Sequence, residues 1–134
     1  MSQDMNEFEG YSFYATTIQA SIFKSLIESI KEILPDTTIE VSNESIRVLS
    51  MDPTHSALVH LTLESENFEK FHCLQNQILG VNMVNFFKLI KIISTKDILT
   101  LFVKSSDLNH LGIRIENPTK NTSTTFKLNL MDLD

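Results

Sequence analysis

Two segments with the period of an amphipathic helix, each followed by alternating strand patterns, constrain the fold of this chain most strongly. Over residues 20–34, apolar residues recur at spacings of three and four until Pro35 ends the helix. Residues 83–93 carry a second apolar stripe, which includes Phe86 and Ile90. Because each helix has one stripe to bury, both are expected to pack on a sheet.

The remaining segments have the β-branched, aromatic or alternating patterns of strands. The predicted strands are residues 13–18, 37–42, 45–50, 57–63, 68–73, 77–82, 98–104, 110–116 and 124–130. Strand, helix and three strands therefore occur twice in the same order. The sequence predicts an α+β domain of two βαβββ units, with the two helices packed on one face of an antiparallel sheet.

The net charge gives an ambiguous signal about partners. The chain has 134 residues, enough for one domain, and a formal charge of −6. An acidic total argues against a nucleic-acid partner, because such proteins are usually basic. Between Lys70 and Lys96, however, there are four lysines and no acid. This distribution arises either by chance or because one surface is kept free of carboxylates for a polyanion.

The helix lysines are the residues best suited to a polyanion. Lys24 and Lys31 lie two turns apart on the first predicted helix, and Lys88 and Lys91 lie three residues apart on the second. Both pairs are predicted to point away from the apolar stripes, either as an ordinary solvated face or as a phosphate-binding surface. Two glutamates accompany the first pair, so the second helix is the stronger candidate. Lysines alone would give sequence-independent, salt-sensitive binding.

A catalytic function has weak support. The best grouping is Asp52 and His55 beside Ser50, Thr54 and Ser56, with Cys73 elsewhere. No nucleophile elbow, phosphate-binding glycine loop or metal-ligand spacing accompanies it, and a lone cysteine more often packs as a small apolar residue. We therefore expect the protein not to be an enzyme and to bind neither a metal nor a cofactor.

Four stretches, in the same order, resemble the eukaryotic-type sliding clamps of the proliferating cell nuclear antigen family. They are SMDPTH with LVHLTL after it (50–63), QASIFK (19–24), the passage from FHC through GVN to KLIK (71–91), and LNLMDLD (128–134). The resemblance runs from about residue 13 to 134.

The resemblance implies a function without catalysis. Such clamps are trimeric rings of six similar domains, with helices lining the hole, that encircle double-stranded DNA and make polymerases processive. The expected partners are double-stranded DNA, a DNA polymerase, other proteins with clamp-binding peptide motifs, and a clamp loader. The expected location is the nucleus, or a viral replication site if the source is a large DNA virus.

The resemblance also implies three sites. Lys24, Lys31, Lys88 and Lys91 would face the DNA. A groove for partner peptides would be lined by Met51, His55, Ser56 and Leu58. Phe126, on the edge strand over residues 121–130, would lie at the subunit interface with Ile92 nearby.

Some features depart from the family pattern. Ser25 stands where many relatives carry a lysine, and Gln75 where an arginine is common, so the basic lining is thinner. Residues 1–12 have no counterpart and are expected to be a flexible acidic tail. Because relatives continue past Asp134, we expect residues 13–134 to be a first domain whose second domain is absent from this chain. The chain alone is then expected to be monomeric or weakly self-associating, and a homotrimer when full length, although a short protein assembling from six copies is an alternative.

Two other functions stay open. One is a checkpoint-type clamp subunit, which shares the fold. The other is a module that binds single-stranded nucleic acid through exposed aromatic residues on neighbouring strands. Phe68 and Phe71 are three residues apart and do not share a strand face, so no such platform can be identified.

Overall fold

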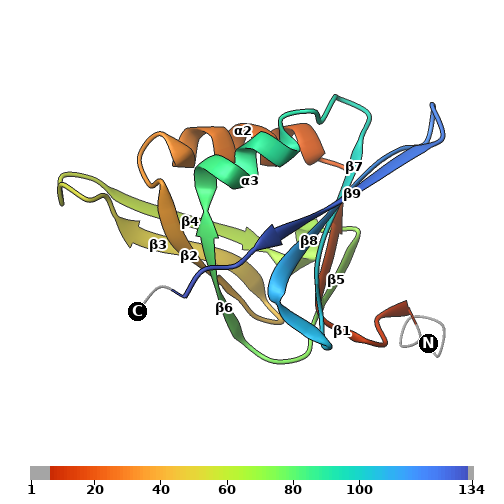
Figure 1. Ribbon diagram of the computed structural model, residues 1–134, viewed down its shortest axis with the longest axis horizontal. Coiled ribbons are helices and arrows are strands. Elements are labelled where there is room, and N and C mark those ends of the chain that lie inside the picture. Colours follow the sequence, from red (N-terminus) through yellow and green to blue (C-terminus); the bar gives the residue numbers. More distant parts are fainter. Residues whose placement is uncertain (1–6, 133–134) are drawn as a thin grey trace.

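Two helices lie side by side and in opposite directions on one side of two antiparallel sheets (Figure 1). The computed structural model describes residues 7–132. The elements are β1 (Tyr11–Thr17), α2 (Ala20–Lys31), β2 (Asp36–Val41), β3 (Ser45–Met51), β4 (Leu58–Glu64), the short 3₁₀ helix η1 (Ser65–Asn67), β5 (Lys70–Cys73), β6 (Gln77–Asn82), α3 (Met83–Ile90), β7 (Ile98–Lys104), β8 (Asp107–Asn117) and β9 (Thr122–Asn129). Neither helix is long and apolar enough to cross a membrane.

The α+β fold of two βαβββ units is confirmed, but the strands form two sheets. One has the order β5-β1-β7-β8-β9 and the other β4-β3-β2-β6. The first strand of each unit therefore lies in the sheet of the other unit: β1 pairs with β7, and β6 pairs with β2. This exchange links the two units through main-chain hydrogen bonds, so neither half is an independent domain.

One stripe from each helix is buried against the sheets. On α2 the buried side chains are Ala20, Phe23, Ile27 and Ile30, and on α3 they include Phe86, whose ring centroid lies 6.0 Å from that of Phe23. Each of the larger side chains contributes about 1.5–3 kcal/mol by leaving water. The helix stripes therefore fix which face of each helix points outward.

The predicted stripe of the first helix was too wide. Ile22 and Ile33 are 58% and 41% exposed, whereas Phe23, Ile27 and Leu34 are buried. The apolar residues of this segment span an arc of about 140° around the helix, and only the part of that arc centred on Phe23 and Leu34 touches the sheets.

The first strand begins earlier than predicted. Tyr11 already pairs with Lys104 of β7, so the prediction of a flexible tail up to residue 12 is wrong for Tyr11 and Ser12. Just before the strand, the ring of Phe8 stacks on His72 with centroids 4.9 Å apart. Residues 1–6 of the predicted tail lie outside the described residues.

One buried hydroxyl offers a test of the core. Thr37 on β2 is 3% exposed, and its Oγ1 has no hydrogen-bond partner among the described residues. Replacing it with the isosteric valine removes an unsatisfied polar group, and we expect Thr37→Val to raise the free energy of unfolding by about 1 kcal/mol. Urea denaturation measures this change. The control is Thr38→Val on the opposite, half-buried side of β2, which we expect to change stability little; a loss of stability in Thr37→Val would show that the hydroxyl is satisfied in solution.

Candidate functional site

The prediction that the two lysines of α2 point away from the core is wrong. Both lie on the side of the helix that faces α3. Lys24 Nζ donates to the carbonyl oxygen of Ile93 at 2.7 Å. Lys31 Nζ forms an ion pair with Glu32 at 2.8 Å and lies 5.0 Å from the centroid of the Phe87 ring on α3. The reason is the position of the buried stripe: with Phe23, Ile27 and Ile30 against the sheets, both lysines fall at its border.

The lysines of the second helix, Lys88 on α3 and Lys91 at its C-cap, are arranged differently. Lys88 and Lys91 are exposed, and neither forms an ion pair with a carboxylate in residues 7–132. Phe86 and Ile90 hold the opposite side of α3 in the core. The ammonium groups of Lys88 and Lys91 are therefore available to an external anion.

The exposed side of α2 is acidic. Glu28 and Glu32 are exposed there, together with Ser25 and Ser29. The hydrogen bond and the charge of Lys31 lower the pKa of Glu32, so this carboxylate stays ionised at neutral pH. The helix layer thus presents an acidic helix beside a basic one, and only α3 suits phosphate groups.

The four residues predicted for a peptide groove lie close together at one end of the four-stranded sheet. Met51 and Leu58 are directly opposite each other on β3 and β4 and are 47% and 63% exposed. His55 and Ser56 are in the exposed turn between these strands, and His55 Nδ1 lies 3.2 Å from Met51 Sδ. The turn and the strand ends therefore form one partly apolar surface.

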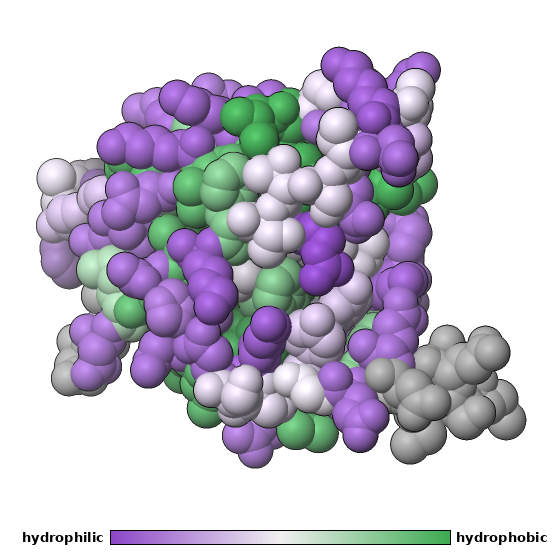
Figure 2. Space-filling model, turned by 45° about the vertical axis from the view of Figure 1, so that its right-hand side comes forward, coloured by the Kyte–Doolittle hydropathy of each residue, from purple (hydrophilic) through white to green (hydrophobic). Residues whose placement is uncertain are grey.

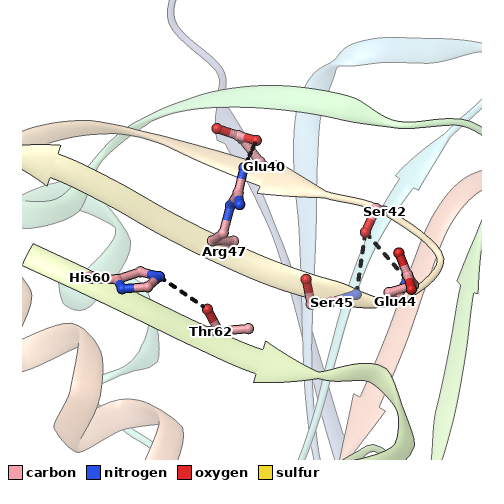
Figure 3. Close-up of polar contacts among 7 residues, drawn as sticks. All are labelled: Glu40, Ser42, Glu44, Ser45, Arg47, His60 and Thr62. Atoms are coloured by element: carbon pink, nitrogen blue, oxygen red, sulfur yellow. Dashed lines mark hydrogen bonds and ion pairs between the residues drawn. The ribbon is translucent and has the colours of Figure 1, made fainter.

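Sequence reasoning missed two neighbours of this surface. Leu49 is 50% exposed and pairs with His60, which is also exposed. The alternation of β3 could have identified Leu49, because it lies two residues before Met51 and so on the same face. Farther along the same face the side chains become polar, with an Arg47–Glu40 ion pair at 2.8 Å and a His60–Thr62 hydrogen bond at 3.5 Å (Figure 3).

The turn between β3 and β4 is organised by a single carboxylate. Asp52 accepts hydrogen bonds from the backbone amides of Ser56 at 2.7 Å and Ala57 at 2.8 Å, and from the hydroxyl of Thr54. This network holds His55 at a φ of 60°, in the left-handed region. The hydroxyl of Thr54 and the amide of Ala57 lower the pKa of Asp52. Asp52 therefore shapes the loop between β3 and β4.

Cys73, the other candidate for catalysis, is poorly placed for that role. Cys73 is buried, and burial raises the pKa of its thiol, which disfavours the reactive thiolate. Within residues 7–132 no group of three or more His, Cys, Asp or Glu residues is placed to hold a metal ion.

Among residues 7–132 the edge strands of the two sheets are β5, β9, β4 and β6, and two of them concern assembly. β9 is the outer strand of the five-stranded sheet, as predicted, and carries half-buried Phe126; Ile92, just after α3, is 54% exposed. β4 is the outer strand of the other sheet. A hollow of about 210 Å³ lies between β4 and α2, lined in part by Ile22 and Leu63. Sequence reasoning did not identify the β4 edge, because strand order depends on tertiary pairing.

An aromatic pair does occur on neighbouring strands of the five-stranded sheet, but it is covered. Tyr14 and Phe102 are direct partners on β1 and β7 and are only 7% and 5% exposed. Phe8 packs on Tyr14 with ring centroids 5.4 Å apart, and the Arg114 guanidinium lies 5.1 Å from the Phe102 ring centroid. The face turned forward in Figure 2 is mostly hydrophilic, and its hydrophobic residues form small patches. These two rings therefore offer no open stacking platform for bases.

Comparison with known proteins agrees with this geometry. The family model described as "Proliferating cell nuclear antigen, N-terminal domain" matches residues 12–134. Over 122 residues the chain is 34% identical to the "Probable DNA polymerase sliding clamp 1" of Paramecium bursaria Chlorella virus 1, covering 91% of this chain and 47% of that protein. The crystal structure of proliferating cellular nuclear antigen from Entamoeba histolytica matches with a TM-score of 0.85 and 31% identity, covering 92% of this chain and 49% of that one. The chain spans about half the length of both relatives.

The role of Asp52 can be tested by pH titration. Because its pKa in the folded protein lies below the ordinary aspartate value, the ordered turn should persist at neutral pH and loosen as the pH falls through the lowered pKa. NMR titration of the Ser56 and Ala57 amide protons should report this midpoint. Thr54→Val should move the midpoint upward, because it removes the largest cause of the shift. A midpoint at or above the ordinary aspartate value in the unmodified protein would contradict this account.

Proposed function

The chain belongs to the proliferating cell nuclear antigen family, and we propose that it works as the first domain of a sliding clamp that encircles double-stranded DNA and tethers replication and repair proteins to it. The observation that carries this proposal is the family match over residues 12–134, together with a helix layer whose α3 presents exposed lysines. In a clamp the ring holds the DNA by topology. Its contacts with phosphates must then be weak and independent of sequence, which lysines without base-reading partners provide.

The proposed DNA surface is the helix layer. Lys88 and Lys91 project from α3 into solvent without a competing carboxylate in the described residues. Lys24 and Lys31 lie in the same layer, although both have intramolecular partners. The total charge of −6 is compatible with this role, because local charge decides where a polyanion approaches.

The proposed surface for partner peptides is the cluster of Met51, His55, Ser56 and Leu58, extended by Leu49. Its support is the exposure of three large apolar side chains at one end of β3 and β4. An apolar or aromatic anchor of a short peptide motif would bury these side chains, as binding hot spots usually do. A DNA polymerase and other clamp-binding proteins would carry such motifs.

The proposed assembly surfaces are the open edges. β9, with Phe126 and the nearby Ile92, would pair with a neighbouring subunit by strand addition, and the β4 edge would offer a second pairing site. Paired in this way, the full-length protein would be a homotrimer, and a clamp loader would be one of its partners. As a scaffold it would catalyse no reaction, and it would act at sites of DNA replication, in the nucleus or at a viral replication site.

The DNA surface predicts a specific salt dependence. Each phosphate contact lowers the slope of log K against log salt by about 0.9. We expect Lys88→Met and Lys91→Met each to reduce the magnitude of this slope by about one for a labelled DNA duplex, measured by fluorescence anisotropy from low salt upward. Lys120→Met, in the turn between β8 and β9, is the matched control and should leave the slope unchanged. Equal slopes in all three variants would exclude α3 as the DNA surface.

The peptide surface predicts a local loss of affinity. We expect Met51→Ala and Leu58→Ala each to weaken saturable binding of a polymerase-tail peptide by about fivefold or more, because a truncated hot-spot side chain costs over about 1 kcal/mol. Isothermal titration calorimetry measures the affinity. Ile78→Ala is the control, since Ile78 is 71% exposed and lies on β6, at the opposite edge of the same sheet. Unchanged binding in the first two variants, or an equal loss in the control, would refute the assignment.

A further inference from the structure

Lys24 connects α2 to the end of α3 through main-chain atoms. Its Nζ donates to the carbonyl oxygen of Ile93 at 2.7 Å and approaches that of Lys91 at 3.5 Å. These carbonyls follow the last turn of α3, whose Phe87 and Ile90 carbonyls already accept the amides of Lys91 and Ile93. Because α3 runs antiparallel to α2 (Figure 1), these contacts place a cation of one helix at the carboxyl end of the other.

The physical consequence is a fixed end for α3. Carbonyl groups at the end of a helix lack intrahelical donors, and they carry the negative end of the helix dipole. An ammonium group there both donates hydrogen bonds and balances that partial charge. Because one acceptor belongs to Lys91 itself, the contact also holds the backbone from which the Lys91 side chain projects.

The surroundings of Lys24 make it a poor phosphate ligand. It is half-buried, and its strongest hydrogen bond is already made within the protein. The exposed side of its own helix carries Glu28 and Glu32, which repel phosphates. Lys31, at the other end of α2, also has partners within the protein, namely the Glu32 carboxylate and the Phe87 ring.

We propose that Lys24 is a positioning residue: it holds the carboxyl end of α3 so that Lys88 and Lys91 meet the DNA, and it is not itself a phosphate ligand. This inference rests on the proposed DNA-binding function. It makes α3 the phosphate-binding helix and α2 its support.

The test compares the salt dependence of duplex binding in Lys24→Met and Lys88→Met. We expect Lys88→Met to lower the magnitude of the salt slope by about one, whereas Lys24→Met, which removes no phosphate contact of its own, should weaken binding at low salt by a few-fold and lower the slope by clearly less than one. Lys24→Arg keeps a cationic donor in reach of the carbonyls and should bind as the unmodified chain does. Thermal melting of each variant confirms that it is folded, and Lys24→Gln replaces Lys24→Met if the latter does not fold.

A double-mutant cycle separates positioning from direct contact. If Lys24 acts through Lys91, the fold-loss caused by Lys91→Met should be smaller in the Lys24→Met background than in the unmodified chain. A slope reduced by about one in Lys24→Met, with losses that simply multiply, would make Lys24 a phosphate ligand and overturn this proposal alone. Failure of the unmodified chain to bind the duplex even at the lowest salt would instead overturn the DNA-binding function and, with it, this role.

Discussion

The structure depends on the burial of one apolar stripe from each helix against the sheets. Because α2 and α3 each have a single stripe, they must lie side by side on the same side of the sheets, with Phe23 against Phe86. Their outward positions then form one continuous surface, and the opposite side of the four-stranded sheet is left free for Leu49, Met51 and Leu58. Both proposed binding surfaces are therefore consequences of the same packing.

The charges on the helix layer follow from how the two helices pack, and the net charge of the chain does not describe them. α3 presents Lys88 and Lys91 without competing acids in the described residues, while α2 presents Glu28 and Glu32. A ring that slides along DNA needs contacts that break easily, and a helix layer with few free cations provides them. The acidic net charge, which on its own argues against DNA, reflects carboxylates outside the acid-free stretch between Lys70 and Lys96.

Much of the fold could be predicted because periodicity is local. The alternation in residues 57–63 and the helical spacing in 83–93 both correspond to real elements, β4 and α3. Some boundaries and buried faces were predicted wrongly. Ile22 was assigned to a buried stripe that it does not join, and Tyr11 belongs to a strand expected to start at residue 13. In both cases contacts with distant segments, the sheets for α2 and β7 for Tyr11, decided the outcome.

The sequence by itself determined the element order, the family and the clustering of the residues proposed for the peptide surface, because the resemblance covers nearly the whole chain and Met51, His55 and Leu58 lie on adjoining strands and their turn. Only the tertiary structure decided the partners of the α2 lysines and the open edge of β4. The physical reason is that the acceptors of Lys24 lie about seventy residues away, and an edge exists only where no other strand pairs. Such relations arise from packing between distant segments, which no local pattern of residues specifies.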